Sequence, residues 1–175
     1  MDTAYRFAAA APDEELVYGA AAPGWHTVAS QETAVRKWIQ FMQDRGIERV
    51  CCLLPGNGNG GCQYNLDRYA AAFGEKNVRQ TPLLDRKLAD RRTLESAILP
   101  FLEESVRGEM PVVVQGLAGL GRTGQVLAAW LVYGRQYTPE DALKTVAEMG
   151  RFPAEPAVDG SATEDELLDR IGAVG

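Results

Sequence analysis

Arg122 and Thr123 follow a glycine-rich loop, and this combination of residue types favours the binding of an anion. Glycine tolerates positive φ, so the chain can curl here and turn successive backbone N–H groups toward one point. The planar guanidinium of Arg122 can hold two phosphate oxygens at once. The residues predicted to bind phosphate are Gly116, Leu117, Ala118, Gly119, Leu120, Gly121, Arg122 and Thr123.

The segments on either side of this loop have the patterns of a buried strand and a buried helix. Residues 112–114 are three valines, which is typical of an inner strand. Residues 125–133 are apolar nearly all round, as expected of a helix in the middle of a domain. A helix that begins directly after the loop adds partial positive charge from its first N–H groups. The arrangement therefore strengthens the prediction of a phosphate-binding loop.

This segment resembles the signature loop of the cysteine-dependent protein tyrosine and dual-specificity phosphatases. The signature is a strand, His-Cys, five residues, Arg, Ser/Thr and Gly, and a helix; Arg122, Thr123 and Gly124 match it in order. The His-Cys pair, however, stands here as Gln115-Gly116. The family cysteine attacks phosphorus as a thiolate, and glycine has no side chain to do so. The resemblance thus implies a pseudophosphatase that has lost its nucleophile at Gly116 and the loop-ordering histidine at Gln115.

The resemblance also implies an aspartic acid that protonates the leaving oxygen. Asp85, directly after a predicted strand at 77–84, matches this position in chain order, and Asp90 is the second choice. Without a nucleophile, Asp85 would be a vestige or a contact at the rim of the loop. The alternative for Asp85 is an exposed or helix-capping carboxylate. The predicted catalytic positions are accordingly Asp85, Arg122 and the lost nucleophile position Gly116.

The spacing of apolar residues predicts strands and helices in alternation. The resemblance implies how they are arranged, as a three-layer α/β domain with four or five central strands, mostly parallel, and helices on both sides. Strands are expected at 16–22, 49–54, 77–84 and 112–114, with 5–7 as a possible edge strand. Helices are expected at 31–44, 66–73, 93–106 with a kink at Pro100, 125–133, 138–150, and from Thr163 onward. Residues 1–175 are expected to form a single domain of the dual-specificity phosphatase kind, with residues 1–12 as a loose lead.

Composition narrows the classes of partner. The chain has 175 residues with a formal net charge of −6, which argues against a general nucleic-acid or membrane-surface binder. Neither a signal peptide nor a long apolar run is evident, and three cysteines indicate reduced thiols, so we expect a cytoplasmic protein. We expect no cofactor and no metal. The expected partner is a phosphate-bearing ligand or a phosphoprotein, and the oligomeric state is open.

Three further motifs have ordinary interpretations. Cys62 and Arg68 also have the spacing of cysteine, five residues and arginine, but no glycine lies between them and Asp67 would repel phosphate. Cys51 and Cys52 are expected to fill space in a buried strand. His26, the single histidine, is expected to be a loop residue bonded to backbone.

Three alternatives remain open for the function. Gly119 to Gly124 also fits the G-x-G-x-x-G pattern of a Rossmann dinucleotide-binding domain, although helices follow it where further strands would be needed. The chain could instead be an active phosphatase whose nucleophile has been exchanged. It could also be a scaffold in which the loop stays empty. The favoured hypothesis is a phosphatase fold that binds a phosphorylated ligand without hydrolysing it.

Overall fold

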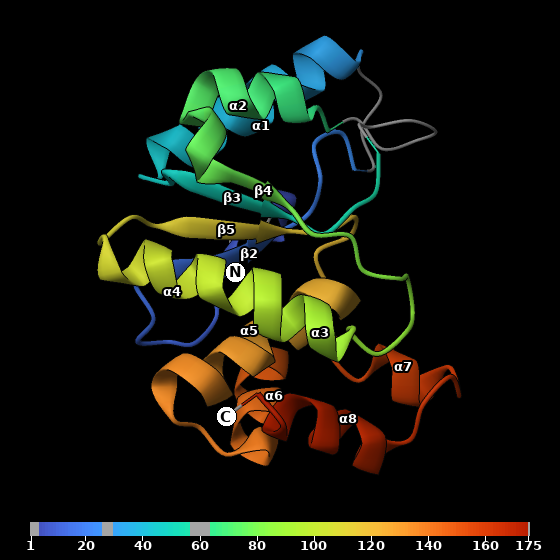
Figure 1. The fold of residues 1–175 in the computed structure, drawn as a ribbon. Coiled ribbons are helices and arrows are strands. Elements are labelled where there is room, and N and C mark those ends of the chain that lie inside the picture. The colour runs from blue at the N-terminus through green and yellow to red at the C-terminus, as the bar shows by residue number, and fades with distance from the viewer. Residues whose placement is uncertain (1–3, 26–29, 57–63, 175) are drawn as a thin grey trace.

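The computed structural model describes residues 4–25, 30–56 and 64–174, and its centre is a five-stranded sheet (Figure 1). The strand order is β1-β2-β5-β3-β4, in which only β1 is antiparallel to its neighbour. The predicted α/β fold with a mostly parallel sheet is therefore confirmed. The strands are β1 Ala8–Ala9, β2 Val17–Ala20, β3 Arg49–Cys52, β4 Val78–Gln80 and β5 Val112–Gln115.

Helices cover both faces of this sheet and produce the predicted three layers (Figure 1). On one side lie α1 Gln31–Asp44 and α2 Leu66–Phe73. On the other side lie α3 Arg91–Thr93, α4 Leu99–Arg107, α5 Gly121–Arg135, α6 Pro139–Glu148, α7 Glu155–Val158 and α8 Glu164–Gly172. Short 3₁₀ turns occupy Ala4–Arg6 and Glu75–Asn77. In the described ranges, no helix combines the length and the apolar character needed to cross a membrane.

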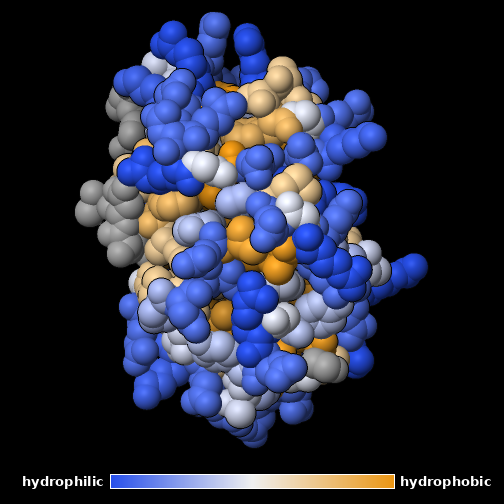
Figure 2. All heavy atoms as spheres, turned by 90° about the vertical axis from the view of Figure 1, so that its left-hand side faces the viewer, coloured by the Kyte–Doolittle hydropathy of each residue, from blue (hydrophilic) through white to orange (hydrophobic). Residues whose placement is uncertain are grey.

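The alternation of side chains along each strand divides the core in two. Val50 and Cys52 point toward the layer of α1 and α2, whereas Cys51 points toward the layer of α4 and α5. The two neighbouring cysteines thus serve opposite faces of β3, and both are fully buried. Their prediction as small core residues is confirmed. Polar and charged side chains predominate around smaller apolar areas on the face shown in Figure 2.

The interruption expected at Pro100 takes the form of a π-helical turn. Residues Leu94–Ile98 form this turn between α3 and α4, and the Leu99 N–H donates to the carbonyl of Leu94, five residues earlier. Proline has no N–H to donate and its ring clashes with the carbonyl four residues before it. A wider turn relieves that clash, so the helical path continues through Pro100.

The expectation of a loose lead over residues 1–12 is wrong for the part that the structure describes. Ala8 and Ala9 form β1 against Gly19 and Tyr18 of β2, and Ala10 and Ala11 are buried. The edge strand thus lies at 8–9 and not at 5–7. Alanine side chains are small enough for this segment to pack closely against the sheet. The alanine-rich composition alone did not indicate this packing.

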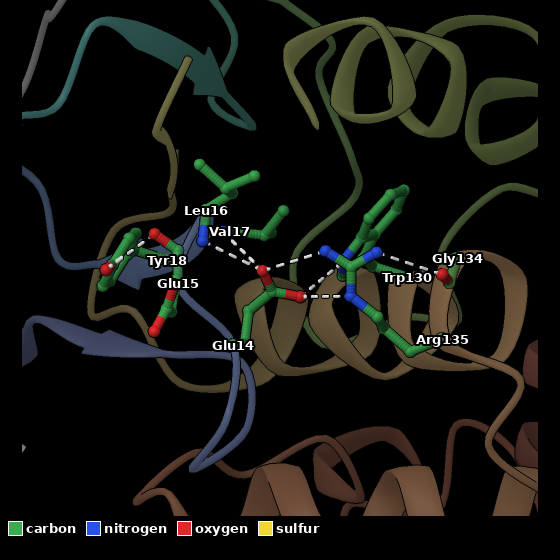
Figure 3. A network of polar contacts seen from close by, with 8 residues as sticks. All are labelled: Glu14, Glu15, Leu16, Val17, Tyr18, Trp130, Gly134 and Arg135. Carbon is green, nitrogen blue, oxygen red and sulfur yellow. Dashed lines mark hydrogen bonds and ion pairs between the residues drawn. The ribbon is translucent and has the colours of Figure 1, made fainter. Parts of the chain in front are cut away.

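A buried carboxylate at Glu14 joins this N-terminal segment to α5 (Figure 3). Its oxygens accept hydrogen bonds from the backbone N–H groups of Leu16 and Val17, at 2.9 and 3.2 Å. They also accept from the indole N–H of Trp130 at 3.0 Å and from the Arg135 guanidinium at 2.9 and 3.2 Å. Burial alone would raise the pKa of Glu14, but the hydrogen bonds from Arg135, Leu16 and Trp130 prevail and lower it.

We expect Glu14→Gln to lower the free energy of unfolding by about 1–3 kcal/mol, because an amide cannot accept all of these hydrogen bonds and leaves Arg135 unpaired. A carboxylate whose pKa is lowered on folding stabilises the protein above its unfolded pKa. That contribution is lost as pH falls through the folded pKa. Urea unfolding at several pH values, compared with the exposed neighbour variant Glu15→Gln, measures the effect. Identical midpoints for both variants at neutral pH would contradict the assignment.

Candidate anion-binding site

A cavity of about 230 Å³ opens where β5 ends and α5 begins. The loop of residues 116–120 forms its floor, at the carboxyl edge of the parallel strands where ligand sites of α/β sheets gather. A larger hollow of about 690 Å³ lies beside α6 and α8 and contains none of the predicted site residues. The residues that line the loop cavity are Trp25, Asp85, Arg86, Gly116, Leu117, Ala118, Gly119, Leu120, Gly121, Arg122, Thr123 and Glu155.

Every carbonyl of residues 116–120 accepts a hydrogen bond from the protein around the loop. The donors are the Gln115 amide, the Ala22 N–H, the Arg6 and Arg151 guanidinium groups, and the N–H groups of Phe152 and Gly124. In a trans peptide the carbonyl of one residue and the N–H of the next point in opposite directions. The N–H groups of residues 117–121 therefore point away from these donors, toward the cavity.

The N–H groups of residues 117–123 have no protein acceptor within the described part of the chain. Those of Gly121, Arg122 and Thr123 belong to the first turn of α5, where N–H groups have no partner inside the helix. Loop and helix together thus present a concentrated set of donors and partial positive charge to one small volume. Such an arrangement can bind the oxygens of a tetrahedral anion.

Gly119 is required for this loop geometry. Its φ is +72°, and a Cβ at this position would lie 2.7 Å from the backbone of Ala20 and Ala21 at the end of β2. Any other residue would combine an unfavourable backbone conformation with a clash against main-chain atoms, which cannot rotate away. The glycine thus lets the loop pack directly on the sheet edge.

Arg122 lies at the head of the loop and is only 9% exposed. Its guanidinium donates to the carbonyl of Leu83 at 3.3 Å and forms an ion pair with Asp85, also at 3.3 Å. The structure thus brings together two residues that the sequence analysis named as catalytic positions. Asp85 is largely exposed on its side of this pair, so it is free to swing away from Arg122 when another anion enters.

Thr123 fills the space that a side chain at position 116 would use. A Cβ on Gly116 would lie 2.6 Å from the Thr123 hydroxyl oxygen, and a Cβ on Gly19 would lie 2.8 Å from its methyl group. Thr123 is 1% exposed, and its hydroxyl has no hydrogen-bond partner among the described residues. Two glycines, one on β2 and one after β5, therefore hold this side chain between them.

Gln115 orders the start of the loop, contrary to expectation. Its amide nitrogen donates to the carbonyl of Gly116 at 2.9 Å, and its amide oxygen accepts from the Tyr69 hydroxyl at 2.9 Å. The side chain is fully buried, so both contacts are shielded from water. An amide offers a donor and an acceptor at once, and this lets it bridge α2 and the loop in place of an imidazole.

The structure adds three residues to the site that sequence reasoning did not assign to it. Arg151, which is 4% exposed, donates to the carbonyls of Gly119 at 2.6 Å, Gly19 at 2.7 Å and Ala8 at 3.3 Å. Burial lowers the pKa of Arg151 to about 10. Trp25 and Glu155 line the cavity itself. The available sequence signal for Arg151 and Glu155 is the stretch RFPAEPAV at 151–158, which resembles the phosphatase-family stretch in which an arginine and a proline precede the last element.

Asp90 and Cys51, two of the remaining candidates, do not line the cavity. Asp90, the second choice for the acid, caps α3 by accepting from the N–H and hydroxyl of Thr93 at 2.9 and 2.8 Å. It is therefore excluded as a partner of Arg122. The Cys62 motif and His26 lie outside the described residues. Burial raises the pKa of the Cys51 thiol to about 11, so this cysteine is a neutral core residue.

Comparison with known proteins agrees with this geometry. The family described as "Polymorphic toxin system, DSP-PTPase phosphatase" matches residues 24–136, which include the whole loop. A search of curated proteins found no match in sequence.

Solved structures with a similar fold cover nearly the whole chain. Tk-PTP in its active form is 24% identical, with 90% of this chain and 94% of that chain covered and a TM-score of 0.66. PTPMT1 in complex with PI(5)P is 15% identical, with 95% and 97% covered and a TM-score of 0.67. TpbA of P. aeruginosa is 17% identical, with 89% and 86% covered and a TM-score of 0.53. The tyrosine-phosphatase-like fold is thereby established.

These findings overturn the Rossmann alternative for Gly119 to Gly124. In the described part of the chain, only the helices α6, α7 and α8 follow α5, and β5 already occupies the middle of the sheet. A dinucleotide-binding domain needs further parallel strands after its glycine-rich loop. The glycine pattern here instead belongs to the loop between β5 and α5 of a tyrosine-phosphatase-like fold.

Proposed function

This chain belongs to the DSP-PTPase phosphatase family of polymorphic toxin systems, and on that premise we propose that it binds a phosphoryl group without hydrolysing it through a cysteine. The observation that carries the proposal is the orientation of the loop. Its carbonyls are all bonded to the surrounding protein, its N–H groups have no protein acceptor among the described residues, and the loop lines one cavity together with Arg122. Backbone N–H donors at the head of a helix, together with a guanidinium, favour a multiply charged oxyanion.

Loss of the nucleophile follows from the residue at position 116. A phosphocysteine intermediate needs a thiolate within reach of the bound phosphorus, and Gly116 carries no side chain. The described cysteines cannot substitute, because Cys51 and Cys52 are buried in β3. Asp85 remains beside Arg122. A general acid at this place would protonate a leaving group, but without a nucleophile no phosphoenzyme forms and no group leaves.

The proposed ligand is a phosphate-bearing small molecule or a phosphoprotein. PTPMT1 was solved with PI(5)P, and a variant form of TpbA was solved with pTyr. The feature that these two ligands share is the phosphate group, so we propose recognition of that group alone. The cavity is small, about 230 Å³, which suits a phosphoryl group with the rest of the ligand outside.

We expect Arg122→Ala to weaken binding of inorganic phosphate about tenfold or more, because the bidentate charge-assisted contact is lost. Arg122→Lys should give an intermediate loss, since a lysine keeps the charge without the fork of donors. Isothermal titration at fixed pH measures both. Arg91→Ala is the matched control, because Arg91 is an exposed arginine on α3 that pairs with Glu95 of the following π-helical turn. Equal affinity in Arg122→Ala and the unaltered chain would overturn the proposal.

The same titration, combined with an assay of aryl phosphate hydrolysis, separates the alternatives. Binding that depends on Arg122, together with no hydrolysis of an aryl phosphate, supports a pseudophosphatase. An unaltered chain that hydrolyses the aryl phosphate would favour an active enzyme in which another group acts. Absence of any binding would leave a scaffold whose loop stays empty.

A further inference from the structure

Glu155 places a second carboxylate in the cavity, directly against the start of α5. It is the first residue of α7 and lines the cavity together with Asp85 and Arg122. A Cβ on Gly121 would overlap the Glu155 carboxyl group, so the glycine at the first position of α5 makes room for this side chain. The carboxylate therefore lies at the helix N-terminus, where an entering anion would be stabilised.

A hydrogen bond from Ser161 joins the segment that carries Glu155 to the segment that carries Asp85. The hydroxyl of Ser161, just beyond α7, donates to the carbonyl of Arg86 at 2.7 Å and to that of Pro156 at 3.2 Å. The segment that carries Glu155 is thus tied to the segment that carries Asp85. Both carboxylates reach the same cavity from two segments that are held together.

The side-chain charges that line the cavity balance when all are ionised. Among the described residues these are the carboxylates of Asp85 and Glu155 and the cations of Arg86 and Arg122. Asp159, after α7, adds negative potential at Glu155 from outside. A dianion that enters the loop would thus bring the negative charge into excess. Asp85 can move into solvent, since it is exposed, but Glu155 is half-buried beside the helix.

The surroundings of Glu155 shift its protonation equilibrium toward the neutral acid. Partial burial raises its pKa above the ordinary value, and Asp85 and Asp159 raise it further, while Arg86 and Arg122 oppose them. A bound anion adds another like charge at close range, which raises the pKa again. A protonated Glu155 also becomes a hydrogen-bond donor, which an anion can use.

We propose that Glu155 couples anion binding to proton uptake: an anion enters the loop as the Glu155 carboxylate takes one proton from solvent and becomes a neutral acid that donates to the anion. This inference rests on the proposed function of the loop. It makes Glu155 a specificity-determining residue, because the cavity then accepts a doubly charged oxyanion well only when it also accepts a proton. The site is accordingly tuned to bind more tightly as pH falls.

Sulfate is the suitable probe, because it stays a dianion between pH 5 and 8 and its own titration does not interfere. We expect the sulfate affinity of the unaltered chain to fall with rising pH, by up to about tenfold per unit for one linked proton. Isothermal titration in two buffers with different ionisation enthalpies should show uptake of up to one proton per sulfate. Glu155→Gln should bind sulfate with much less pH dependence, without proton uptake, and more tightly at pH 8.

Glu164→Gln is the matched control, because Glu164 is exposed on α8 and does not line the cavity. It should keep the pH dependence and the proton uptake of the unaltered chain. Sulfate binding without proton uptake in the unaltered chain would overturn the role of Glu155, as would unchanged uptake in Glu155→Gln. If that binding still depended on Arg122, the proposed function would stand. Absence of sulfate binding in both the unaltered chain and Glu155→Gln would overturn both proposals.

Discussion

Gly116→Cys combined with Thr123→Ser is expected to hydrolyse an aryl phosphate on the order of 10²-fold or more faster than the unaltered chain. The new thiol would stand at the start of the loop, facing the N–H groups of residues 117–123 and the first turn of α5. Such surroundings lower the pKa of a cysteine and produce the reactive thiolate. Arg122 would orient the phosphoryl group, and Asp85, which pairs with Arg122 at 3.3 Å, would act as the general acid for the leaving oxygen.

The second substitution is needed because of how Thr123 packs. A Cβ at position 116 would come within 2.6 Å of the Thr123 hydroxyl, and the threonine cannot turn freely because its methyl group lies against Gly19. Serine lacks that methyl group, so its hydroxyl can rotate into the vacated space. Gly116→Cys alone should therefore be less active and less stable than the double variant.

The control is Gly116→Ser combined with Thr123→Ser, which adds a similar side chain without a thiolate. A stopped or continuous assay of the phenol released from the aryl phosphate compares both variants with the unaltered chain. Equal rates in the two double variants would mean that the thiolate does nothing. A folded cysteine variant without activity would show that the loop is no longer a catalytic scaffold.

Arg151→Met is expected to lower the free energy of unfolding by about 3 kcal/mol, since buried carbonyls that lose their donors remain unsatisfied. Arg151 donates to Gly119 in the loop, to Gly19 in β2 and to Ala8 in β1. Its removal would therefore loosen the loop and the edge of the sheet together. Urea unfolding should show a midpoint lower by roughly 1 to 2 M.

Two further variants test whether the position of the guanidinium matters. Arg151→Lys keeps one cation but not the fork of donors, so its midpoint should lie between those of Arg151→Met and the unaltered chain. Arg6→Met removes the donor to the carbonyl of Ala118, a single contact at 3.3 Å, and should have a small effect. A loss in Arg6→Met as large as in Arg151→Met would contradict the central role of Arg151.

Much of the fold could be predicted from local patterns. The bounds of α1 and α2 match the expected helices, because Ser30 and Asn65 cap their first turns and apolar residues repeat at helical spacing. Strands were expected too long: β4 covers only Val78–Gln80 of the predicted 77–84. The ends of a strand depend on where the neighbouring strands stop pairing, and the sequence of one segment does not show which strand it pairs with.

The sequence by itself determined the glycine-rich loop that ends in Arg122 and the absence of a side chain at position 116, because the glycine spacing, Arg122 and the flanking strand and helix all lie within one continuous stretch. Only the tertiary structure decided that Arg151 holds the loop and that Glu155 enters the cavity. Arg151 bonds to Ala8 across 143 positions of the chain, and Gln115 bonds to Tyr69 across 46. Such contacts arise when the sheet assembles, so their geometry is a property of the packed layers and not of any local pattern.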